Sequence, residues 1–99
     1  MDLIFTERAD NDLKELEQDA SCKPLVRGIY RTLAFMALDL RHSSLNTHEY
    51  HNLQGPEGQK VFEAYVHPGA YRVFWYYGPL KGQITVVAVV AHPNKKSFR

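Results

Sequence analysis

The spacing of apolar residues changes near residue 42, and this change constrains the fold more than any other feature of the sequence. Before it, apolar side chains recur every three or four residues, which is the period of an α-helix. After residue 59 they occur in runs rich in valine, tyrosine and phenylalanine, separated by glycine and proline, which is typical of strands joined by short turns. A chain of 99 residues has room for one modest core. We therefore expect one α+β domain spanning residues 1–99.

The first part of the chain predicts a strand followed by a two-helix hairpin. Residues 3–5 form a short apolar run, and Thr6 is a suitable N-cap for the helix that follows. The apolar stripe of this helix consists of Ala9, Leu13, Leu16 and Ala20. A second, more apolar helix begins near Pro24 and keeps its period to about Arg41.

The second part predicts a loop and then a three-stranded antiparallel meander. Residues 42–58 lose all periodicity and are rich in polar residues and glycine, so we expect a long loop there. Strands are expected over residues 60–67, 71–77 and 83–91. The last strand is apolar on both alternating faces, so it should be central or covered on both sides. The two helices should pack on one face of this sheet.

The formal net charge of +1 conceals two regions of opposite sign. Residues 1–20 hold seven acids and two bases, a net charge of −5, whereas residues 21–99 hold ten bases and four acids, a net charge of +6. We interpret the acidic run as the solvated face of the first helix. The basic remainder suggests an anionic partner.

The composition also bears on where the protein acts and on what it binds. One cysteine, Cys22, cannot form an internal disulfide and excludes a cysteine-rich zinc site, which fits a reducing compartment. The first ten residues do not resemble a secretory signal, and the longest apolar run is too short to cross a bilayer. We expect a soluble, cytoplasmic protein without membrane contact.

Two residues of the predicted sheet are candidates for chemistry. Arg72 lies within an apolar strand, where it either extends over the sheet and pairs with Glu63 or binds a phosphate with its planar donor fork. His92 follows the last strand and is either a polar strand end or a proton-transfer group. Lys95 and Lys96 add positive charge to the tail beyond it.

Three histidines of the predicted loop raise the question of a metal site. His48 and His51 are three residues apart with Glu49 between them, and His42 precedes them. No further cysteine, aspartate or histidine completes a well-supported ligand set. We therefore predict no metal and no other cofactor.

Four segments together resemble the RelE/ParE superfamily of bacterial toxins. They occur in matching order at residues 4–16, 61–65, 71–75 and 86–92. The resemblance implies the toxin of a type II toxin–antitoxin pair, with a cognate antitoxin as partner. RelE-like members cleave messenger RNA, often on the ribosome and without a metal, whereas ParE-like members inhibit DNA gyrase. It also implies the RelE-like α+β fold described above.

The resemblance suggests roles for particular residues. Arg72 matches the strand arginine that contacts the scissile phosphate, and His92 falls near a position used for proton transfer or phosphate contact. These two are the predicted catalytic residues, and Lys60, Lys95 and Lys96 are the predicted RNA-binding residues.

This chain also departs from the pattern of the nuclease members. Glu63 and Tyr65 occur where those members often carry lysine or arginine, and Phe98 occurs where many carry a catalytic tyrosine. Lys60, His42 and His48 are the candidates to replace the missing groups, and their distance from Arg72 is not given by the sequence.

Two hypotheses of function follow. The first is a metal-independent endoribonuclease that inhibits translation by cleaving messenger RNA, either free or on the ribosome. The second is an inhibitor that docks on gyrase, or an inactive member that only binds, motivated by the incomplete catalytic set and by the aromatic residues 74–77, which we expect to be exposed. A cognate antitoxin is the expected partner of either.

Overall fold

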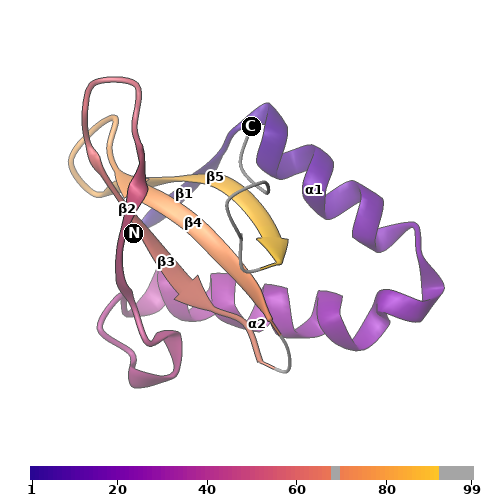
Figure 1. Ribbon diagram of the computed structural model, residues 1–99. Helices are drawn as coiled ribbons and strands as arrows, with labels where there is room; N and C mark the ends of the chain where they lie inside the picture. The colour runs from indigo at the N-terminus through magenta and orange to yellow at the C-terminus, as the bar shows by residue number, and fades with distance from the viewer. Residues whose placement is uncertain (68–69, 92–99) are drawn as a thin grey trace.

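The computed structural model describes residues 1–67 and 70–91, and Figure 1 shows them as one mixed sheet with two helices. In chain order the elements are β1 (Asp2–Phe5), α1 (Glu7–Glu17), the 3-10 helix η1 (Ala20–Cys22), α2 (Lys23–Leu38), the 3-10 helix η2 (Ser43–Leu45), β2 (His48–Gln54), β3 (Lys60–Tyr65), β4 (Tyr71–Tyr77) and β5 (Gln83–Ala91). A strand, two helices and an antiparallel meander follow one another as expected. The predicted α+β fold is therefore confirmed.

Local sequence signals account for the bounds of the two helices. The Thr6 hydroxyl accepts a hydrogen bond from the Ala9 N–H at 3.1 Å, so this residue caps α1 as predicted. Proline occupies the first turn of α2, where its missing N–H costs no helical hydrogen bond. The helix ends at Leu38, three residues before the predicted end, because Asp39 adopts an extended backbone with φ −161° and ψ 96°.

The strand order is β1-β5-β4-β3-β2, which makes β5 an inner strand. The first strand runs parallel to β5, with Phe5 opposite Val86, and every other pair is antiparallel. The expectation that the last strand is central is thereby confirmed. Most of its apolar residues are buried, because those on one face pack against the helices and those on the other face join a second apolar cluster.

One sequence prediction was wrong: residues 42–58 are not a continuous loop. They contain η2 and the edge strand β2, which pairs antiparallel with β3, so the meander has four strands rather than three. In the register His48 lies opposite Glu63 and Tyr50 lies opposite Val61. This edge strand contains two histidines and a glutamate and has no clear apolar alternation, so its sequence did not predict a strand. Backbone pairing with β3 stabilises it instead.

The two faces of the sheet differ in what covers them. The face toward the helices holds the larger core, in which Ala9 and Leu13 of α1 and Ile29 of α2 pack against strand residues such as Trp75. The opposite face, which we call the open face, carries a smaller apolar cluster of Val61, Phe74, Tyr76 and Ala88. Because side chains alternate along a strand, the residues beside this cluster at positions 63, 65 and 72 also belong to the open face.

The expectation that the aromatic residues 74–77 are exposed was wrong for three of the four. Phe74, Trp75 and Tyr76 are buried on one face of the sheet or the other, and only Tyr77 is exposed. Trp75 belongs to the helix-side core, and Phe74 and Tyr76 belong to the apolar cluster of the open face, on the middle strand of the five-stranded sheet.

Candidate functional site

The strand register brings a charged cluster together on the open face. Tyr65 of β3 lies opposite Arg72 of β4, and Glu63, two residues earlier on β3, lies opposite His48 of β2. Residues two apart on one strand share a face, so these four side chains occupy one area across three strands. We call His48, Glu63, Tyr65 and Arg72 the open-face cluster.

Arg72 is held by contacts on several sides. Its Nε lies 3.4 Å from Glu63 Oε1, its guanidinium carbon lies 3.7 Å from the centre of the Tyr65 ring, and Nη1 donates to the Tyr71 carbonyl at 2.9 Å. Only 12% of the side chain is exposed. The pairing with Glu63, one of the two interpretations drawn from the sequence, is therefore present, and the stacking on Tyr65 fixes the plane of the guanidinium.

Glu63 connects the arginine to a histidine that the sequence did not place here. Its side chain is 3% exposed, and its second oxygen, Oε2, lies 3.4 Å from His48 Nε2. The His48 ring also contacts Tyr65 edge to face, with ring centres 5.5 Å apart. His48 thus lies across one buried carboxylate from Arg72. This contact follows from the pairing of β2 with β3, and the sequence analysis did not predict β2.

The remaining predicted site residues lie elsewhere or outside the described residues. Lys60 begins β3, and its Nζ lies 3.9 Å from Glu49 Oε1 of β2. Glu49 is paired with Phe62, which stacks on Trp75 of the helix-side core, so Lys60 and Arg72 are not brought together. The predicted residues His92, Lys95 and Lys96, together with Phe98, lie outside the described part of the chain.

The other two loop histidines have local contacts of their own. His42 stacks on Phe35 with ring centres 4.0 Å apart, and its Nδ1 accepts a hydrogen bond from the Ser44 N–H at 3.1 Å. His51 Nδ1 lies 3.3 Å from Glu49 Oε2. Over residues 1–67 and 70–91 no group of three or more histidine, cysteine, aspartate or glutamate side chains is arranged to hold a metal ion. No helix among those residues is long and apolar enough to cross a membrane.

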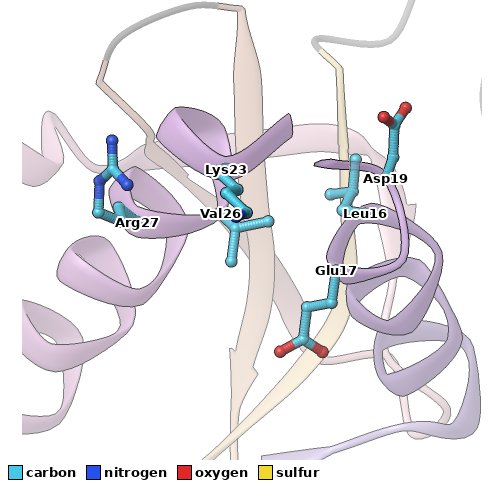
Figure 2. Close-up of a pocket in the computed structure, with 6 residues that line it drawn as sticks. All are labelled: Leu16, Glu17, Asp19, Lys23, Val26 and Arg27. Carbon is cyan, nitrogen blue, oxygen red and sulfur yellow. The ribbon is translucent and has the colours of Figure 1, made fainter. Parts of the chain in front are cut away.

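A separate cleft of about 270 Å³ lies in the helical hairpin, between the end of α1 and the start of α2. Figure 2 shows the residues that line it, which are Leu16, Glu17, Asp19, Lys23, Val26 and Arg27. In this view the Glu17 and Asp19 carboxylates point in opposite directions, and the Arg27 side chain is directed away from both. The charged groups of the cleft do not converge on one ligand position.

Hydrogen bonds within the hairpin explain this arrangement. Glu17 Oε2 accepts from the Tyr30 hydroxyl at 2.9 Å, and Asp19 Oδ1 accepts from the Ser21 hydroxyl and backbone N–H at 2.6 and 2.9 Å. Partial burial and the bond to Glu17 raise the pKa of Tyr30, and the bonds from Ser21 lower the pKa of Asp19. Glu17 thus joins the two helices and Asp19 caps η1, and the open-face cluster is the stronger candidate for a site.

Comparison with known proteins defines the class of fold. No protein-family model and no curated protein sequence matches this chain. Several solved structures do match over nearly its whole length, and they are toxins of the RelE and YoeB/ParE type. The fold that the sequence resemblance implied is therefore confirmed.

Three of these structures illustrate the match. A YoeB/ParE toxin from Agrobacterium tumefaciens is 12% identical, with a TM-score of 0.69 over 94% of this chain and 100% of that chain. A chain of the archaeal RelE–RelB complex from Pyrococcus horikoshii is 13% identical, with a TM-score of 0.64 over 94% of this chain and 96% of that chain. The YoeB dimer from Staphylococcus aureus is 15% identical, with a TM-score of 0.62 over 94% and 98%. The TM-scores, over 94% of this chain, establish the shared fold.

Proposed function

We propose that this protein is the toxin of a type II toxin–antitoxin pair and acts in the cytoplasm as a metal-independent endoribonuclease on messenger RNA. The observation that carries the proposal is the open-face cluster, in which a stacked arginine lies on the face of a RelE-type sheet opposite α1 and α2. A guanidinium is suited to a phosphodiester because its planar fork matches two phosphate oxygens. The basic character of residues 21–99 supports an anionic substrate.

In the proposed reaction the RNA cleaves itself while the protein orients and stabilises it. The 2′-hydroxyl loses its proton and its oxygen bonds to the adjacent phosphorus, while the bond from phosphorus to the 5′-oxygen breaks and that oxygen takes up a proton. Arg72 stabilises the negative charge on the phosphate oxygens, and losing one such preorganised donor costs about 2.7–4 kcal/mol of barrier. We assign proton transfer to His92 and further electrostatic stabilisation to Lys95 and Lys96.

We also propose a cognate antitoxin as partner. Two of the similar structures are toxin–antitoxin complexes, RelE–RelB from Pyrococcus horikoshii and RelBE from Escherichia coli. The alternative of a gyrase inhibitor had two motives, the incomplete catalytic set and the expected exposure of four aromatic residues. Three of those four residues are buried, so the second motive no longer supports it.

Primer extension on messenger RNA from cells in which the protein is induced tests the proposed activity. We expect discrete new 5′ ends, and we expect Arg72→Ala and His92→Ala to reduce cleavage by about a hundredfold or more. Arg72→Lys keeps the positive charge but loses the planar pair of donors, so it should also reduce cleavage. This variant tests the role of Arg72 if Arg72→Ala folds poorly. Arg31→Ala is the matched control, because Arg31 is exposed on α2. Growth arrest with intact messenger RNA would contradict the nuclease and favour gyrase.

A further inference from the structure

The charge of the open-face cluster depends on one side chain. Arg72 carries a positive charge, but the buried carboxylate of Glu63 lies 3.4 Å from it and offsets that charge. An RNA phosphate approaching this pair would meet nearly equal opposite charges. Among the described residues His48 also contacts this carboxylate, so the charge summed over Arg72, Glu63 and His48 is zero when the ring is neutral and +1 when it is protonated.

The geometry around His48 suits the protonated ring. Nδ1 lies 3.1 Å from the Asn46 carbonyl oxygen, and Nε2 lies 3.4 Å from Glu63 Oε2. Both neighbours are hydrogen-bond acceptors when the carboxylate is ionised. A neutral imidazole has one N–H and leaves its other nitrogen facing an acceptor, whereas the imidazolium donates from both nitrogens. The side chain is 48% exposed, so a ligand can reach it from solvent.

The contact from His48 to Glu63 is also long enough to be shared with a ligand. Charge-assisted hydrogen bonds from nitrogen to oxygen are typically about 2.7–2.9 Å. Both Arg72 Nε and His48 Nε2 stand 3.4 Å from the carboxylate oxygens. His48 Nε2 therefore does not make its shortest available bond to Glu63, and a phosphate oxygen arriving from the open face can share this nitrogen, whereas Arg72 Nε is buried.

We propose that His48 is a second phosphate-binding residue of the open-face cluster and that its imidazolium form supplies the net positive charge through which the cluster binds an RNA backbone. The groups that face His48 are Glu63 and the Tyr65 ring on β3, Arg72 beyond the carboxylate on β4, and the Asn46 carbonyl before β2. The inference rests on the proposed ribonuclease function, because it names how that site takes its substrate.

Binding of a single-stranded oligoribonucleotide with 2′-O-methyl groups tests the inference without cleavage. Fluorescence anisotropy of the labelled oligonucleotide is measured at pH 6 and pH 9 over a series of salt concentrations. We expect wild-type protein to bind about tenfold more tightly at pH 6, the effect of one charge-assisted hydrogen bond. His48→Gln, which keeps a polar side chain and lacks the charge, should abolish this difference. It should also reduce the slope of log affinity against log salt by about 0.7 at pH 6 only.

His51→Gln is the matched control, since His51 also pairs with a glutamate of the same sheet but is 79% exposed and belongs to the Glu49 pair. This variant should keep both the pH dependence and the salt slope of the wild type. If His48→Gln keeps them as well, the inference is wrong, and RNA cleavage in cells still tests the proposed function separately. If wild type binds the oligonucleotide at neither pH, the inference fails; if cells also show no RNA cleavage, the proposed function fails with it.

Discussion

At the scale of single residues, Glu63 decides the state of the open-face cluster. A carboxylate with 3% of its side chain exposed is costly unless a cation lies beside it; Arg72 provides one from β4, and the His48 ring of β2 contacts the same carboxylate. The same carboxylate keeps the Arg72 side chain over the Tyr65 ring. Charge pairing and the orientation of the arginine are therefore coupled.

We predict that removing either partner of this pair destabilises the fold more than removing both. Glu63→Leu leaves the Arg72 guanidinium without its counter-charge and should lower the free energy of unfolding by about 3 kcal/mol. The double variant Glu63→Leu/Arg72→Met replaces the pair with apolar side chains and should recover much of that loss. Urea unfolding of the wild type, the single variants Glu63→Leu and Arg72→Met, and the double variant measures the coupling. A coupling energy below about 0.5 kcal/mol would show that the pair does not interact.

At the scale of elements, α1 covers the part of β5 that extends beyond β1. The first strand pairs with β5 only as far as Val86, so the next residues of that edge need other partners. The Thr6 hydroxyl donates to the Val87 carbonyl at 3.0 Å, and Asp12 Oδ2 accepts from the Val89 N–H at 2.9 Å. Asp12, which was predicted to belong to the solvated face of the first helix, thus provides a hydrogen-bond acceptor for the edge of β5.

We predict that Asp12→Ala weakens this edge. The Val89 N–H would lose its acceptor in a partly buried place, which costs about 1–3 kcal/mol of unfolding free energy. Hydrogen exchange of the Val89 amide should become faster together with the loss of stability. Asp10→Ala removes an exposed acid from the first turn of the same helix and should change stability by no more than about 1 kcal/mol. Equal effects of the two substitutions would exclude an edge-covering role for Asp12.

At the scale of the whole molecule, α2 lies close against the sheet at one place. The Thr32 hydroxyl donates to the Tyr65 carbonyl at 3.1 Å, at the end of the strand that carries the open-face cluster. One turn earlier, a Cβ added to Gly28 would collide with the His67 carbonyl oxygen. Glycine allows this close approach, which supports β3 from the helix side while its other face carries Glu63 and Tyr65.

We predict that Gly28→Ala destabilises the protein although alanine is the better helix former. The gain in helix propensity is about 1 kcal/mol, and the backbone shift needed to avoid the collision costs about 1–3 kcal/mol. Ala34→Gly at an exposed position of the same helix measures propensity alone and should cost about 1 kcal/mol. Thermal and urea unfolding of both variants check the prediction. A stabilised Gly28→Ala variant would mean that the helix moves without cost.

The sequence allowed the class of fold to be predicted because its signals are local. The Thr6 cap, the helical apolar period and the turn residues between later strands each depend on neighbours in the chain, and the structure confirms the elements they predicted. The β2 strand was missed because its stability comes from pairing with β3 rather than from its own polar residues. Strand order and the parallel pairing of β1 with β5 likewise depend on residues about eighty positions apart.

The sequence by itself determined that Arg72 would need a partner, because an apolar strand cannot bury a guanidinium alone. The two candidate partners were Glu63 and a phosphate, and neighbouring residues in the chain could not decide between them. The tertiary structure decided that Glu63 lies beside the arginine and that His48, from a segment without a clear period, reaches the same carboxylate. Side-chain period and capping are properties of a short stretch of chain, whereas the contact between His48 and Glu63 exists only because the sheet register aligns three strands.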